Sequence, residues 1–144
     1  MKTRHGVTIT APIERVWDVF SDVERWPEWT ASMSSVELLD GTELTVGARA
    51  RIKQPRLPRL VWTVTAVEPG RSWTWQTRGP GATTTATHVL EPLDDTTTRV
   101  EQTIEQAGLL GVIVARLSAR LTRRYLAMEA DGLGHRVAAG VSPA

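Results

Sequence analysis

The sequence predicts an α+β domain in which a curved antiparallel sheet of about seven strands wraps around a long C-terminal helix. Residues 4–29 contain a strand-like run and two short helical runs, residues 33–106 alternate with period two, and residues 109–140 change to helical period. Because the links between the strand-like runs are short, consecutive strands are expected to pair antiparallel. A chain of 144 residues is expected to form a single domain, 1–144.

The N-terminal strand, 4–11, leads into a helical corner. Pro12 is well placed as the first residue of a helix over 12–20. Ser21 or Asp22 is expected to cap a second short helix (VERW). That helix is expected to end or bend at Trp26, because Pro27 disfavours the helical region for the residue before it.

Six strand-like runs follow, separated by turn signals such as DGTE, EPGR and GPG. They cover residues 33–41, 48–54, 59–70, 71–81, 83–95 and 97–106. Charge indicates which face of each strand points inward, because a face that packs on a helix must be apolar. This reasoning places the following side chains on the inner face: Ala50, Ile52, Leu60, Trp62, Val64, Trp73, Trp75, Ala86, His88, Leu90, Val100, Gln102 and Ile104.

The last helix, over 109–140, has an apolar stripe at helical spacing. The stripe consists of Leu110, Val114, Leu117, Leu121, Tyr125 and Met128. One such helix offers too little apolar surface to cover the concave face of a large sheet, so part of that face is expected to bound a cavity. Residues 141–144 are expected to form a frayed tail.

The predicted cavity has a mixed lining that is typical of a small-molecule site. The candidate ligand-binding residues are Trp62, Trp73, Trp75, His88, Gln102, Leu117, Leu121 and Tyr125. The same side chains could instead have a purely structural role. Trp73 and Trp75 can be core residues, and His88 can be a hydrogen-bonded core or rim histidine.

Composition and motifs narrow the classes of function that the chain can have. A net charge of +1, from 17 basic and 16 acidic residues, does not favour a dedicated nucleic-acid binder. The absence of cysteine excludes disulfides and thiolate ligands, and the three histidines lack metal-ligand spacing, so neither a metal nor another cofactor is expected. The N-terminus lacks the apolar region of a signal peptide and no stretch is apolar enough to span a membrane, which favours a cytoplasmic protein, monomeric or homodimeric.

The chain resembles the START-like (SRPBCC) superfamily, in its polyketide cyclase/dehydrase branch of bacterial proteins. The resemblance covers essentially the whole chain. It is carried by ITAPIERVWDVFSDVERWPEWTASM, VGARARIK, RSWTWQTRGPG, THVLEP, TTRVEQTIE and RRYLAMEADGL. It implies the helix-grip fold, in which two short helices form a V that supports the long helix and closes one end of a cavity. Trp26 and Trp29 would lie at this corner, and we expect Trp29 mainly to pack against the scaffold.

Three functional hypotheses remain. We favour a protein that binds an apolar or aromatic, lipid-like or polyketide-like molecule in the cavity. The alternative is a polyketide cyclase-type enzyme in which His88 is the candidate general base and Tyr125 or Gln102 polarises a carbonyl. The third is a stress or toxin-type protein that acts through a macromolecular partner, for which an arginine stripe over 116–124 is the relevant feature.

Overall fold

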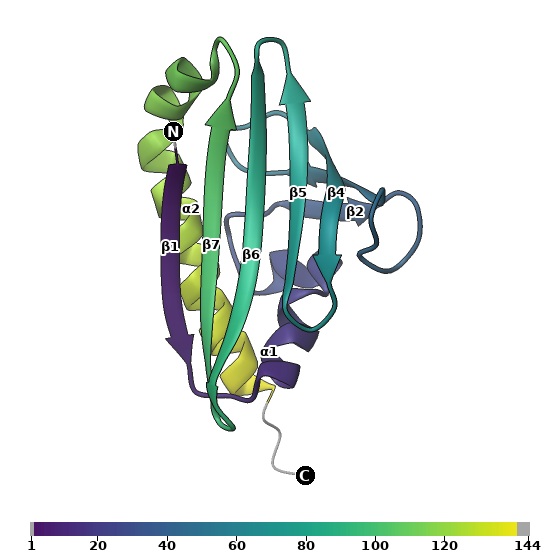
Figure 1. Cartoon of the computed structure of the whole chain (residues 1–144), viewed down its shortest axis with the longest axis vertical. Helices are drawn as coiled ribbons and strands as arrows, with labels where there is room; N and C mark the ends of the chain where they lie inside the picture. Colours follow the sequence, from purple (N-terminus) through teal and green to yellow (C-terminus); the bar gives the residue numbers. More distant parts are fainter. Residues whose placement is uncertain (1, 141–144) are drawn as a thin grey trace.

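The structure, a computed structural model that describes residues 2–140, contains a seven-stranded antiparallel sheet and a long C-terminal helix (Figure 1). The expected fold class is therefore confirmed. The expected tail at 141–144 lies outside the described residues. The strands are β1 (Lys2–Ile9), β2 (Ser35–Leu38), β3 (Arg49–Lys53), β4 (Leu60–Glu68), β5 (Ser72–Gly79), β6 (Ala82–Asp94) and β7 (Thr97–Ala107). The helical elements are α1 (Ile13–Phe20), the 3-10 helix η1 (Val23–Glu28) and α2 (Gly111–Ala139).

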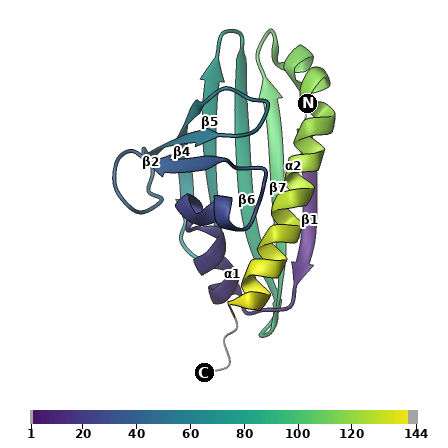
Figure 2. The ribbon, with the colours of Figure 1, turned by 180° about the vertical axis from the view of Figure 1, so that it is seen from behind.

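The sheet has the order β1-β7-β6-β5-β4-β3-β2, so the first strand pairs with the last and the other strands follow as a meander. Figure 2 shows α2 crossing the concave side of this sheet along β1 and β7, with α1 at the end where α2 finishes. Among the strands, α2 contacts mainly β1 and β7, and β6 to a smaller extent.

The inner face predicted from charge alternation is confirmed. Trp75 lies opposite Val64 on β4 and Ala86 on β6, and Ala86 lies opposite Ile104 on β7. In the same way, His88 on β6 lies between Trp73 and Gln102. Both tryptophans, His88 and Gln102 are buried.

The helical corner differs from the sequence prediction. The segment does not end at Trp26 but continues to Glu28 as η1, with Pro27 inside it. Asp22 precedes η1 without a side-chain capping hydrogen bond, and its carboxylate instead pairs with Arg25 at 3.4 Å. Pro27 has no backbone N–H to donate, and the N–H groups of Trp29 and residue 30 both donate to the carbonyl of Trp26 at the end of η1.

The two tryptophans of the corner have different positions. Trp26 is fully buried, stacks on Phe20 with ring centroids 5.3 Å apart, and donates its indole N–H to the Phe20 carbonyl at 2.8 Å. Trp29 is half-buried and packs against α2 at Gly132, where a Cβ would overlap the Trp29 carbonyl oxygen and lie 3.0 Å from its indole ring. The expected packing role of Trp29 is therefore confirmed, and Gly132 makes the close approach possible.

The apolar stripe predicted for α2 is buried only in part. Tyr125 is buried, whereas Leu117 is 84% exposed and Leu110 and Val114 are also exposed. The buried residues of α2 are Gly111, Ala115, Tyr125, Leu126, Glu129, Ala130, Leu133 and Val137. The prediction was wrong for the first turns because LLGVIVARL is apolar at nearly every position, so helical period there does not define one face.

Candidate functional site

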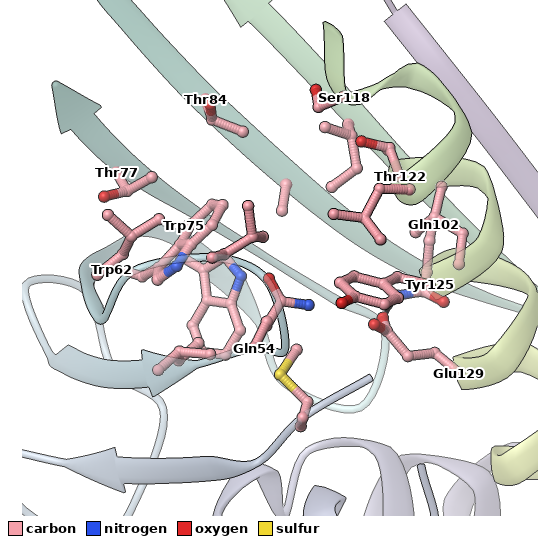
Figure 3. Close-up of a pocket in the computed structure, with 18 of the residues that line it drawn as sticks. Gln54, Trp62, Trp75, Thr77, Thr84, Gln102, Ser118, Thr122, Tyr125 and Glu129 are labelled. Atoms are coloured by element: carbon pink, nitrogen blue, oxygen red, sulfur yellow. Dashed lines mark hydrogen bonds between the residues drawn. The ribbon is translucent and has the colours of Figure 1, made fainter. Parts of the chain in front are cut away.

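A cavity of about 180 Å³ lies between the inner face of the sheet and α2 (Figure 3). One wall comes from β3 to β7, including Ile52, Trp62, Trp75 and Ala86. The other wall is one side of α2, with Val114, Ser118, Leu121, Thr122, Tyr125, Leu126 and Glu129. Gln54 and Leu57, from the link between β3 and β4, and Trp26 and Met33, from the corner region, complete the lining.

The apolar side of the cavity is formed mainly by two indole rings. Trp62 and Trp75 project from neighbouring strands, with their ring centroids 6.2 Å apart and their planes tilted by 45°. Their inward direction follows from the strand parity already described. Two large flat rings at this spacing offer a surface on which a planar apolar ligand can stack.

The polar side of the cavity is a hydrogen-bonded cluster around Glu129 of α2. Gln102 on β7 donates from Nε2 to Glu129 Oε1 at 3.0 Å, and Ser32 donates from its hydroxyl to Glu129 Oε2 at 2.7 Å. Ser32 also contacts the hydroxyl of Thr30 at 2.9 Å. In Figure 3, Gln102, Tyr125 and Glu129 lie together on the side of the cavity opposite Trp62 and Trp75.

Burial changes the acidity of Glu129. The side chain is removed from water, which raises its pKa to about 7, although the hydrogen bonds from Ser32 and Gln102 act in the opposite direction. A carboxyl group with this pKa exchanges a proton readily near neutral pH. Perturbed carboxyl groups that line a cavity are frequent at functional sites.

His88 has the opposite shift. It is buried beneath Trp73, whose ring stacks on the imidazole with centroids 4.1 Å apart, and desolvation lowers the pKa of His88 to about 3. The imidazole is therefore neutral at pH 7. Its Nδ1 lies 3.2 Å from the Trp73 carbonyl oxygen, so Nδ1 carries the proton and Nε2 is an acceptor.

Tyr125 uses its hydroxyl to hold the cavity wall in place. The hydroxyl donates to the backbone carbonyl of Pro55, in the link between β3 and β4. This bond connects α2 to the segment that carries Gln54 and Leu57, across the space that the cavity occupies. The Tyr125 hydroxyl is therefore engaged with the scaffold in this structure.

Six of the eight residues proposed from sequence line the cavity. They are Trp62, Trp75, His88, Gln102, Leu121 and Tyr125. Trp73 and Leu117 do not line it, which corrects the expected set. Trp73 is buried in an aromatic cluster with Trp17, Phe20 and Trp26, and Leu117 points to the outside of α2.

Sequence reasoning missed Glu129 and Ser32. Glu129 could have been found, because it follows Leu121 and Tyr125 at intervals of four residues and so lies on their side of the helix. Ser32 carries no comparable signal, since it lies in the irregular segment after η1 and reaches Glu129 only through the fold.

Within residues 2–140, no cluster of three or more His, Asp or Glu side chains is arranged to hold a metal ion.

The seven-stranded antiparallel sheet and the long C-terminal helix define a domain of the helix-grip class. The chain matches the model of the polyketide cyclase/dehydrase and lipid transport family over residues 1–138, and it belongs to this family. Two Streptomyces proteins, named as candidate polyketide cyclases, are similar over 73 residues: one from S. cyaneus at 34% identity and one from S. halstedii at 32%. These matches span 51% of this chain, and 40% and 56% of the respective relatives.

Solved structures share the fold over nearly the whole chain. The Zhui aromatase/cyclase from Streptomyces sp. R1128 has a TM-score of 0.80 at 17% identity, covering 99% of this chain and 96% of that one. A protein from Thermus thermophilus has a TM-score of 0.77 at 20% identity, covering 99% and 100% of the two chains. At these identities the similarity concerns the fold. No helix within residues 2–140 is long and apolar enough to cross a membrane.

Proposed function

We propose that this protein binds an apolar or aromatic small molecule, polyketide-like or lipid-like, in the cavity between the sheet and α2. The observation that carries the proposal is the division of the cavity into an indole wall, Trp62 and Trp75, and a polar wall around Glu129 and Gln102. A flat ligand stacked on the indoles would turn its polar edge toward the opposite wall. Membership of a family described by cyclase, dehydrase and lipid transport activities agrees with a ligand of this kind.

The size of the cavity indicates the size of the ligand. An engineered cavity of about 150 Å³ is known to bind benzene, and the volume here is about 180 Å³. One aromatic ring or two fused rings therefore suit the cavity in this conformation. A longer ligand would need the wall held by Tyr125 and Pro55 to move outward.

Two polar groups would orient such a ligand. Nε2 of His88 can accept a hydrogen bond from a hydroxyl group, because Nδ1 is the protonated nitrogen. The amide of Gln102 donates one N–H to Glu129 and has a second N–H for a ligand carbonyl. A phenol or an enolised ketone would satisfy both.

The test uses 2-naphthol, an aromatic probe of two fused rings, and measures its binding by isothermal titration calorimetry. Leu121→Trp fills the cavity and is expected to weaken probe binding about tenfold or more, because the larger side chain occupies the ligand volume. Leu117→Trp is the matched control, one turn earlier on the outer side of α2, and is expected to leave probe affinity unchanged. Absence of probe binding, or equal loss in both variants, would refute the proposal.

A cyclase-type enzyme is the second candidate, and the Glu129 cluster is the observation that favours it. With a pKa near 7, the Glu129 carboxylate could take a proton from a C–H between two carbonyls of a poly-β-ketone. The carbanion would close a ring by attack on a third carbonyl, and the carboxylic acid would return the proton to the alkoxide so formed. Neutral His88, with its pKa lowered to about 3, is the weaker base for this step.

A synthetic linear poly-β-keto thioester tests this second candidate. Ring closure followed by loss of water gives a product lighter by one water molecule, which mass spectrometry detects. Turnover is expected to fall at least about 100-fold in Glu129→Gln, while probe affinity stays within a few-fold. Unchanged turnover in Glu129→Gln would remove Glu129 from the reaction and leave the binding function as the only candidate.

A further inference from the structure

The start of α2 exposes an unusual amount of apolar surface. Of the ten large apolar side chains that are exposed in residues 2–140, six lie in residues 109–117. They are Leu109, Leu110, Val112, Ile113, Val114 and Leu117. Leu109 is 95% exposed and Ile113 is 55% exposed, so these side chains are not the edges of a covered core. A contiguous apolar patch of this kind on a monomer indicates an interaction site.

Four arginines lie within and after this apolar segment on the same helix. Arg116, Arg120, Arg123 and Arg124 are all exposed. None of their guanidinium groups forms an ion pair or a hydrogen bond within the part of the chain that the structure describes. Residues 109–128 contain no aspartate or glutamate, so this segment carries a local positive charge although the whole chain is nearly neutral.

Along the outer side of α2, helical geometry places apolar side chains first and arginines after them. Ile113, Leu117, Arg120 and Arg124 follow one another at intervals of four, three and four residues, which keeps them on one line. Arg124 lies about 10 Å further along the axis than Leu117. The first acidic residue on that line is Asp131, about 10 Å beyond Arg124. The surface is therefore apolar at the end of the helix and basic behind it.

We propose that this surface, residues 109–124, docks on an anionic lipid membrane. The apolar side chains would enter the boundary between headgroups and acyl chains, and the arginines would contact lipid phosphates at the level above it. Charge complementarity selects this partner. A second copy of the chain, packed about a two-fold axis, would bring two sets of unpaired arginines together, and a nucleic acid would leave Ile113 and Leu117 without an apolar partner.

The docking surface is continuous with the cavity. Val114 is exposed and also lines the cavity, and Ser118 and Leu121 continue the lining one and two turns further along α2. A membrane in contact with residues 109–117 would therefore face this end of the cavity. This placement would allow an apolar ligand to pass between the membrane and the cavity. Such an exchange rests on the proposed function, whereas the docking itself does not.

Vesicle flotation tests the docking, using phosphatidylcholine vesicles with and without phosphatidylglycerol. The wild-type chain is expected to bind the phosphatidylglycerol vesicles and to lose affinity as salt is added. Arg120→Gln/Arg124→Gln is expected to weaken binding about 30-fold, and Ile113→Ser/Leu117→Ser about tenfold or more. All four side chains are exposed, so the variants are expected to retain the circular dichroism spectrum of the wild type.

The matched control is Arg15→Gln/Arg71→Gln, which makes the same charge change at the end of the molecule where α1 and the turn between β4 and β5 lie (Figure 1). It is expected to change vesicle binding by less than about threefold. The proposal is overturned if the wild type does not bind phosphatidylglycerol vesicles, or if the control variant loses as much affinity as Arg120→Gln/Arg124→Gln. Two further outcomes overturn it. In the first, Ile113→Ser/Leu117→Ser dissociates a dimer of this chain while its vesicle binding stays at the wild-type level. In the second, the chain binds duplex DNA tightly, and Ile113→Ser/Leu117→Ser changes neither DNA binding nor vesicle binding.

Binding of 2-naphthol without vesicles separates the two proposals. The Arg120→Gln/Arg124→Gln variant is expected to bind the probe as the wild type does, because neither arginine lines the cavity. Loss of vesicle binding with normal probe binding therefore concerns the docking surface alone. Absence of probe binding in a wild type that binds vesicles would refute the cavity function and leave the docking surface in place.

Discussion

Replacing Glu129 with glutamine is expected to change how the free energy of unfolding depends on pH. Burial raises the pKa of Glu129 to about 7 in the folded chain, against 4.5 for an unperturbed glutamate. Between these two pH values the folded chain keeps the proton and the unfolded chain has released it. Stability from this group is therefore fully present below pH 4.5 and is lost as the pH rises through 7.

The expected size of the effect follows from the shift. At about 1.4 kcal/mol per pH unit, the difference between 4.5 and about 7 corresponds to roughly 3 kcal/mol. His88 acts in the opposite direction, because its pKa is lowered from 6.5 to about 3 and its contribution is lost as the pH falls. Between pH 4.5 and 6.5, Glu129 makes the free energy of unfolding fall with rising pH and His88 makes it rise. The contribution of Glu129 is therefore visible only as a difference between variant and wild type.

Urea unfolding at pH 4 and at pH 8, on wild type and Glu129→Gln, measures this difference. Relative to the wild type, the variant is expected to gain roughly 3 kcal/mol of stability between the two pH values, because glutamine does not ionise. Glu91→Gln, on an exposed position of β6, controls for the change of a carboxyl to an amide as such. If the free energy of unfolding changes by the same amount between pH 4 and pH 8 in wild type and in Glu129→Gln, Glu129 is not held protonated by burial and the reasoning is refuted.

Two further changes test the scaffold around the site. Gly132→Ala is expected to destabilise the fold by about 2–4 kcal/mol, because the new Cβ would overlap the Trp29 carbonyl oxygen. Gly134→Ala, where no atom lies within 4 Å of the new Cβ, should be neutral or stabilise by up to about 1 kcal/mol, and similar urea midpoints for the two variants would contradict the close approach. Tyr125→Phe is expected to cost about 1 kcal/mol and to speed amide hydrogen exchange in residues 54–59, since the bond to Pro55 is lost. Unchanged exchange there would show that the hydroxyl does not hold this segment.

Much of the fold follows from local patterns. The charged side chains of Arg49, Arg51 and Lys53 identify the outer face of β3, and the same alternation assigns Trp62, Trp75, His88 and Gln102 to the inner face. These assignments need no knowledge of the partner strand, because successive side chains of a strand point to opposite faces. The order of the elements and six of the eight proposed cavity residues follow in the same way.

Tertiary structure alone decided which parts of those faces are covered and how the cavity groups are paired. Helical period marks an apolar side of α2, but at residues 109–117 the apolar residues surround the helix, and only the position of α2 over β1 and β7 leaves Leu117 exposed. Glu129 is an ordinary acidic residue in the sequence. It acquires a pKa of about 7 because the fold buries it and brings up Gln102, 27 residues away, and Ser32, 97 residues away. Desolvation depends on every surrounding atom, so a local sequence pattern does not encode it.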